Sequence, residues 1–150
     1  MSERILLGHG GGGSLTQGLI DRDMRPLYAD PGAPLHDAAS LALPHGRLAF
    51  STDGYVVNPL EFPGGDIGRL AVVGTCNDLA MAGARPWALS LGLILEEGLE
   101  LALLRRILAS VAAAATDCDV QVVTGDTKVV ERGKACLLYT SDAADDSLRV

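Results

Sequence analysis

Alternating hydrophobic positions make residues 86–95, PWALSLGLIL, the clearest strand signal in the chain. Leucines recur at every second position of this segment, a period that is typical of a strand with one buried face. After Gly98, apolar residues recur every three to four positions as far as about Thr116, which predicts a long helix. Its expected apolar stripe consists of Leu99, Leu103, Ile107, Val111 and Ala114.

Shorter patterns predict the remaining elements. Asp66 is a favourable N-cap for a helix from Ile67 to about Ala82, which Gly83 would end. The resulting order of strand, helix, strand, helix and strand indicates an α/β or α+β layer, without fixing the order of the strands. The other expected strands cover residues 48–51, 55–58 and 120–124, with a tight turn at Asp53-Gly54 between the first two.

The end of the chain does not follow these patterns. Residues 136–150 show no apolar period that would indicate a helix or strand, and the string CLLYTSDAADD resembles an in-frame translation of a transposon end used as a sequencing adapter. We therefore expect a domain of residues 1–135, truncated from a longer protein, followed by a non-native tail of residues 136–150. Deleting this tail is expected to leave stability unchanged.

Composition narrows the class of protein. A length of 150 residues suits one domain, and 48% hydrophobic residues with only 4% aromatic residues predict an aliphatic core. A net charge of −7 argues against nucleic acid or an anionic membrane as a partner. The chain has neither an apolar run long enough to span a membrane nor a signal-peptide pattern, so a cytoplasmic location is expected.

The glycine run GHGGGGS near the N-terminus has two interpretations. So many glycines cost conformational entropy, which suits either a flexible linker or a loop whose N–H groups surround a phosphate. The run is not a Walker A loop, because Ser14 and Leu15 stand where Lys and Ser or Thr are required. A match to G-x-G-x-x-G is weak, since any glycine run satisfies it.

Acidic residues supply the second candidate chemistry. Asp53 and Asp126 are each expected just after a strand, and Asp78 lies beside Asn77 inside an apolar helix, where an unpaired carboxylate is costly. Each has a structural explanation on its own, as a turn, an ion pair or a cap. Together with the glycine run, these carboxylates and Lys128 supply what the binding of a magnesium nucleotide requires.

Three longer segments carry a family resemblance: STDGYVVNPLEFPGGDIGRLAVVGTCNDLAMAGARP, LSLGLILEEG and VVTGDTKVVERG. They resemble the N-terminal domain of the HypE family, in the aminoimidazole-ribonucleotide-synthetase-like (PurM-like) ATP-binding superfamily. The resemblance runs from about Leu6 to Ala135. It implies a PurM-like α/β (α+β) fold with a mostly antiparallel sheet flanked by helices, and two copies that dimerise through their sheets with ATP near the interface.

The same resemblance implies an activity. HypE proteins are carbamoyl dehydratases, which use ATP and Mg²⁺ to convert an S-carbamoyl group on their own C-terminal cysteine into a thiocyanate for nickel–iron hydrogenase. The implied partners are a second copy of the chain, the carbamoyltransferase HypF and the HypC–HypD complex. The C-terminal domain and its cysteine are not in this chain, so we expect the fragment alone to be inactive.

Carried over by position, the resemblance assigns roles to particular residues. Metal ligands would be Asp53, Asp78 and Asp126, and catalytic residues would be Lys128, Asp78 and Asn77. Nucleotide-binding residues would be Gly10, Gly11, Gly12, Gly13, Asp53, Asp126 and Thr127. Two alternatives remain: another ATP-using member of the superfamily, such as a thiamine-phosphate kinase or selenophosphate synthetase, and a non-catalytic docking module that binds nucleotide.

Overall fold

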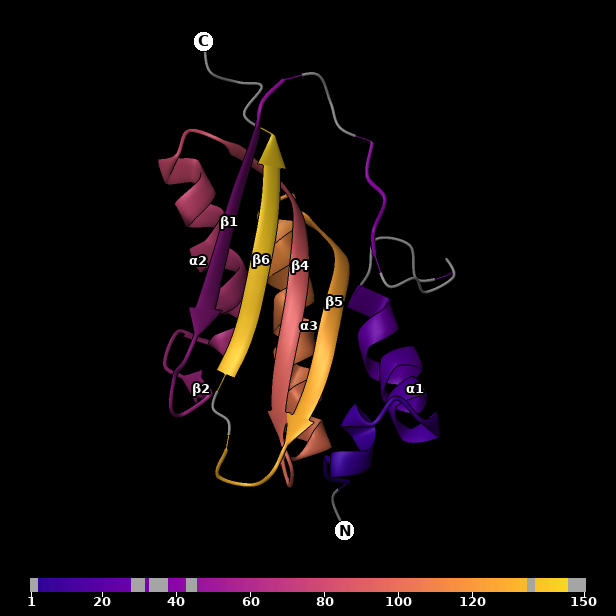
Figure 1. The fold of residues 1–150 in the computed structure, drawn as a ribbon. Coiled ribbons are helices and arrows are strands. Elements are labelled where there is room, and N and C mark those ends of the chain that lie inside the picture. The colour runs from indigo at the N-terminus through magenta and orange to yellow at the C-terminus, as the bar shows by residue number, and fades with distance from the viewer. Residues whose placement is uncertain (1–2, 28–31, 33–37, 43–45, 135–136, 146–150) are drawn as a thin grey trace.

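Two long helices cover one face of a four-stranded sheet, and within the described part of the chain no helix lies on the other face (Figure 1). The computed structural model describes residues 3–27, 32, 38–42 and 46–134, and the backbone of 137–145. The strands of this sheet are β1 (Leu48–Tyr55), β4 (Arg85–Glu96), β5 (Gln121–Val130) and β6 (Leu137–Asp145). The helices are α2 (Ile67–Met81) and α3 (Leu101–Asp117).

The strand order is β1-β6-β4-β5, so β4 and β6 are central and β1 and β5 are the edges. β6 runs antiparallel to both of its neighbours, whereas β5 runs parallel to β4. A two-stranded ladder of β2 (Glu61–Phe62) and β3 (Gly65–Asp66) precedes α2. The expected α/β architecture with a mostly antiparallel sheet is confirmed.

The core lies between β4 and the helices. Leu89, Leu91, Leu93 and Leu95 of β4 are all buried, as the alternating pattern predicts. On α3, Ile107, Val111 and Ala114 of the predicted stripe are buried. The prediction of its first two residues is wrong. Leu99 and Leu103 are only partly covered, whereas Leu101 and Leu104 are buried.

The ends of α2 follow the sequence signals. Asp66 is the N-cap, and its Oδ1 accepts a hydrogen bond from the backbone N–H of Arg69 at 2.9 Å. The chain leaves α2 through Gly83, whose φ of 77° is favourable for glycine. Within the helix, a Cβ at Gly68 would lie 2.6 Å from the carbonyl oxygen of Ile107, so this glycine allows α2 to approach α3 closely.

An N-terminal segment packs beside the β5 edge of the sheet (Figure 1). Three of its hydrophobic side chains, those of Ile5, Leu19 and Met24, are buried in the same core as the β4 leucines. Its elements are η1 (Leu7–Gly10), α1 (Ser14–Leu19), the π-helical turn η2 (Ile20–Met24) and η3 (Arg25–Leu27).

Three predictions about the strands are wrong. β1 continues through Asp53 and Gly54 without a turn, because all eight of its residues pair with β6. β5 likewise continues through Asp126, paired with β4 as far as Val130. The segment predicted to lack regular structure forms β6, because strand pairing uses backbone N–H and C=O groups and does not need an apolar period.

The place of β6 reverses the expectation for the C-terminal segment. Deleting residues 136–150 would remove the strand that joins β1 to β4, so we predict a fall of more than about 1 kcal/mol in the free energy of unfolding. Urea denaturation of the two chains measures it, and a deletion of 146–150 alone is the control because it leaves β6 in place. Equal stability of the full chain and the longer deletion would support a dispensable tail.

Candidate functional site

Asp126 and Lys128 form an ion pair on β5. Lys128 Nζ lies 3.0 Å from Asp126 Oδ1 and 2.9 Å from Oδ2, and the backbone N–H of Thr127 donates to Oδ1 at 2.8 Å. The bond from Lys128 is the main reason that the pKa of Asp126 lies below its usual range. Both side chains are about two-thirds exposed, so the pair adds little to stability and both groups remain accessible.

The alternation of β5 places this pair on the uncovered face of the sheet. Thr127 Oγ1 lies 3.4 Å from the sulfur of the buried Met24, and Val129 packs against the core, so these two residues face the helices. Asp126 and Lys128 alternate with them and therefore face the other way. Gly125 precedes the pair because a Cβ there would overlap the carbonyl oxygen of Leu91 on β4.

The glycine run is a docked loop beside β5. A Cβ at Gly10 would lie 2.7 Å from the backbone nitrogen of Val129, so only glycine permits this approach. Gly12 has φ of 77° and donates its N–H to Thr16 Oγ1 at 3.0 Å. Around Gly12 and Gly13, open space surrounds the position of a Cβ. The loop therefore has defined contacts at one end and an open surface at the other, which does not fit a flexible linker.

Asp53 and Asp78 lie on the helix side of the sheet, near Tyr55. The Tyr55 hydroxyl is 3.2 Å from Thr75 Oγ1, which itself donates to the carbonyl of Ala71 at 2.8 Å. Asp53 precedes Tyr55 by two residues on the same strand face, and Asp78 follows Thr75 by about one helical turn.

Charges in this region act on Tyr55. Burial is the main reason that the pKa of Tyr55 is raised to about 12, and the nearby carboxylates of Asp53 and Asp78 contribute to this rise. Asp78 and Asn77 are exposed on α2, so the prediction that they lie buried inside the helix is wrong. The reason is the position of the buried stripe of α2, which leaves residues 77 and 78 on the exposed side of the helix. The stripe consists of Ala71, Val72, Thr75, Cys76 and Leu79.

The predicted residues thus form two separate groups, one at each edge of the sheet. Backbone register places Asp53 opposite Thr140, Thr140 opposite Leu91, and Leu91 opposite Gly125. Asp53 and Asp126 are therefore almost in one row, three strand spacings or about 14 Å apart, and on opposite faces. Among the described residues, no three His, Cys, Asp or Glu side chains gather as a metal site.

Each group has its own chemistry. Asp53 and Asp78 carry carboxylate oxygens, the type of ligand that Mg²⁺ prefers. Asp126 has its charge matched by Lys128, and the open glycines beside β5 offer backbone N–H groups to an anion. A cavity of about 430 Å³ elsewhere, lined by Leu95, Ile107 and Arg132 among others, includes none of these residues.

Sequence reasoning missed the tyrosine beside the carboxylates. Tyr55 is buried at the end of β1, and a Cβ at Gly74 would overlap its hydroxyl, so this helical glycine makes room for the ring. The signals were a tyrosine two residues after Asp53 and a glycine inside a predicted helix. Both have meaning only once β1 and α2 are known to pack together.

Comparison with known proteins identifies the family. Residues 35–141 match the family described as AIR synthase related protein, N-terminal domain. The chain belongs to this family. In the described part of the chain, no helix is long and apolar enough to cross a membrane.

Individual relatives support the resemblance to HypE. The chain is 57% identical over 138 residues to carbamoyl dehydratase HypE of Rhodobacter capsulatus, covering 89% of this chain and 40% of that protein. It is 46% identical over 145 residues to HypE of Escherichia coli, covering 93% of this chain and 43% of that protein. The chain therefore spans about two-fifths of the length of these curated relatives.

Solved structures agree. Hydrogenase maturation protein HypE in complex with ATP matches with a TM-score of 0.88 and 49% identity, over 93% of this chain and 42% of that one. A HypE–HypF complex matches with a TM-score of 0.65 and 38% identity, over 89% of this chain and 42% of that one. Thiamine-monophosphate kinase from Stenotrophomonas maltophilia matches with a TM-score of 0.53 and 24% identity, over 96% of this chain and 44% of that one. This match is a likeness of fold alone.

The environment of Tyr55 gives a test of the geometry at β1. A tyrosine whose pKa is raised on folding stabilises the fold fully below its unfolded pKa of about 10 and loses that contribution as pH rises toward 12. We predict that Tyr55→Phe removes an ionisation with a midpoint near pH 12 from the ultraviolet titration of the folded chain. If the lost ionisation has a midpoint near 10, Tyr55 is not buried against Thr75.

Proposed function

We propose that this chain is the N-terminal, nucleotide-binding part of an ATP-dependent carbamoyl dehydratase that serves nickel–iron hydrogenase maturation. The observation that carries this proposal is the close structural likeness, over nearly the whole chain, to a HypE that holds ATP. The thiamine-phosphate kinase alternative has only a likeness of fold in its favour. Dehydration itself needs the S-carbamoyl cysteine of a complete protein, so this chain supplies the ATP-binding step.

The two residue groups divide the work of holding MgATP. Asp53 and Asp78 would hold Mg²⁺, which neutralises phosphate charge, with Asn77 beside them. Gly10 to Gly13 would donate N–H groups to the phosphates, and Lys128 would place an ammonium group against them. Thr127 and Asp126 would keep Lys128 in position, consistent with the ion pair on β5.

Pairing of two copies is a way to bring the two edges of the sheet together. Leu48 and Phe50 alternate with the inward-facing Tyr55, and they are 50% and 65% exposed on the uncovered face of the sheet. If two sheets pack face to face around a two-fold axis parallel to the strands, β1 of one copy lies opposite β5 of the other. We therefore propose a homodimer in which the two edges that carry the predicted site meet.

The proposal extends to partners and location. A complex of HypE with HypF supports a carbamoyltransferase of that type as the source of the carbamoyl group. We further propose transfer of the cyano group to a HypC–HypD complex, and a cytoplasmic location. Neither nucleic acid nor a membrane is proposed as a partner of this acidic chain.

Domain organisation is also a proposal. Residues 1–135 would form the native domain, and residues 136–150 would be an adapter-derived segment that occupies the β6 position. Strand pairing through the backbone allows a foreign sequence to fill such a position. The match to the family reaches residue 141, which is within this segment.

Substitution of Asp78 tests the site. Because Asp78 is exposed, we predict that Asp78→Asn leaves the stability of the nucleotide-free chain unchanged. It should weaken MgATP binding about tenfold, on the order of 1.4 kcal/mol, by removing one metal ligand. Calorimetric titration measures the affinity, with Asp117→Asn as the control, because Asp117 is an exposed aspartate at the far end of α3 that pairs with Arg69. Equal affinities for Asp78→Asn and the control would exclude Asp78 from the site.

A further inference from the structure

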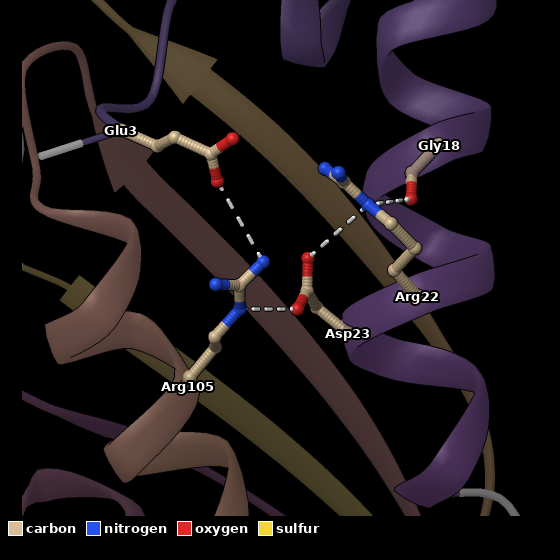
Figure 2. A network of polar contacts seen from close by, with 5 residues as sticks. All are labelled: Glu3, Gly18, Arg22, Asp23 and Arg105. Atoms are coloured by element: carbon tan, nitrogen blue, oxygen red, sulfur yellow. Dashed lines mark hydrogen bonds and ion pairs between the residues drawn. The ribbon is translucent and has the colours of Figure 1, made fainter.

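Asp23, in the π-helical turn η2, carries a carboxylate that the fold buries almost completely. Its side chain is only 6% exposed, although η2 belongs to the N-terminal segment at the edge of the sheet. Its Oδ1 accepts a hydrogen bond of 2.7 Å from Nε of Arg105, which comes from α3 (Figure 2). A buried carboxylate depends strongly on such a partner, because its charge has lost its hydration.

The second oxygen of this carboxylate, Oδ2, is buried and has no hydrogen-bond partner among the described residues. Arg22 Nε lies 4.0 Å from it. That Nε donates instead to the carbonyl oxygen of Gly18 at 3.1 Å (Figure 2). Within the described residues, Arg105 therefore supplies the one hydrogen bond to the Asp23 carboxylate. Arg105 also forms an ion pair with Glu3, with 3.8 Å between its guanidinium nitrogen and the Glu3 carboxylate oxygen. These acidic neighbours raise the pKa of Arg105, so it stays charged.

The residues around Asp23 belong to the same unit as the glycine loop. Met24 follows directly and its sulfur accepts from Thr127 of β5, while at the other end of the segment Gly10 lies against Val129. The segment thus touches β5 at two neighbouring inward-facing residues, and Asp23 ties it to α3. In the part of the chain that the structure describes, neither Asp23 nor Arg105 forms a hydrogen bond or ion pair with the open glycines Gly12 and Gly13.

We propose that Asp23 and Arg105 are positioning residues that keep the glycine loop docked on β5 in a form ready to bind phosphate. Without Arg105, the buried charge of Asp23 keeps only the longer ion pair with Arg22, at 4.0 Å, which favours release of η2 from α3. The loop then loses its fixed place beside Thr127 and Val129. The effect on docking needs no nucleotide, whereas the effect on phosphate binding rests on the function proposed above.

Hydrogen exchange of the nucleotide-free chain tests the docking. We expect Arg105→Gln to speed exchange of the backbone amides of residues 8–13 by more than about tenfold while the amides of β4 keep their rates. Arg106→Gln is the matched control, since Arg106 is the next residue of α3 and pairs bidentately with Glu61 of β2, at 2.7 and 2.9 Å. This control should leave residues 8–13 unchanged. Adding Asp23→Asn to Arg105→Gln should slow the exchange of residues 8–13 again, because the double variant has no buried carboxylate charge at position 23.

Nucleotide binding completes the test. Arg105→Gln should weaken MgATP binding by the factor by which it lowers the docked fraction of the loop, and Asp23→Asn with Arg105→Gln should recover part of that loss. The exchange rates of residues 8–13, compared with their unprotected rates, give that fraction. An equal rise of exchange in residues 8–13 and β4 would make the pair a general element of stability and overturn the proposal, as would unchanged loop exchange. If the loop responds as expected but the unmodified chain does not bind MgATP, the positioning role stands and the proposed nucleotide function fails.

Discussion

The packing of the β4 leucines against α2 and α3 is the contact on which the rest of the structure depends. β4 holds β6 on one side and β5 on the other, so its buried face decides which residues of its neighbours face the helices. Through this register, Thr127 and Val129 turn inward to meet the N-terminal segment. Asp126 and Lys128 consequently turn outward, and Asp53 turns toward α2.

This constraint explains why the candidate carboxylates do not form one site. Asp78 lies on the helix where the sequence places it, whereas Asp53 and Asp126 lie inside strands and not just after them. The sheet separates Asp53 and Asp78 from Asp126. The uncovered face, with exposed Leu48 and Phe50, is the surface through which a second copy would bring the β5 edge of its sheet against the β1 edge of this one. In that account Asp126 and Lys128 face the second copy, whereas Asp53 and Asp78 stay on the helix side of their own sheet.

Much of the fold could be predicted from local signals. The leucine alternation of β4, the Asp66 cap and the Gly83 end of α2 were all readable from the sequence, because each depends on neighbouring residues. β6 could not be found in this way, since its pairing with β1 and β4 is non-local and uses the backbone. The turn predicted at Asp53-Gly54 failed for the same reason: a local preference gave way to a ladder with a distant strand.

The site was harder to predict than the fold. Residue types indicated phosphate and magnesium chemistry, but strand register and face decide which of those residues meet. The burial of Tyr55 under Gly74 and of Asp23 under α3 also depends on contacts between segments far apart in sequence. A pattern of single residues does not contain that information.

The most direct test is a two-dimensional NMR titration of the isotopically labelled chain with MgATP. The account predicts saturable shifts concentrated in the amides of Gly10 to Gly13, Thr127 to Lys128, Asp53 and Asp78. It would be contradicted by the absence of saturable shifts, or by shifts confined to the cavity lined by Leu95, Ile107 and Arg132.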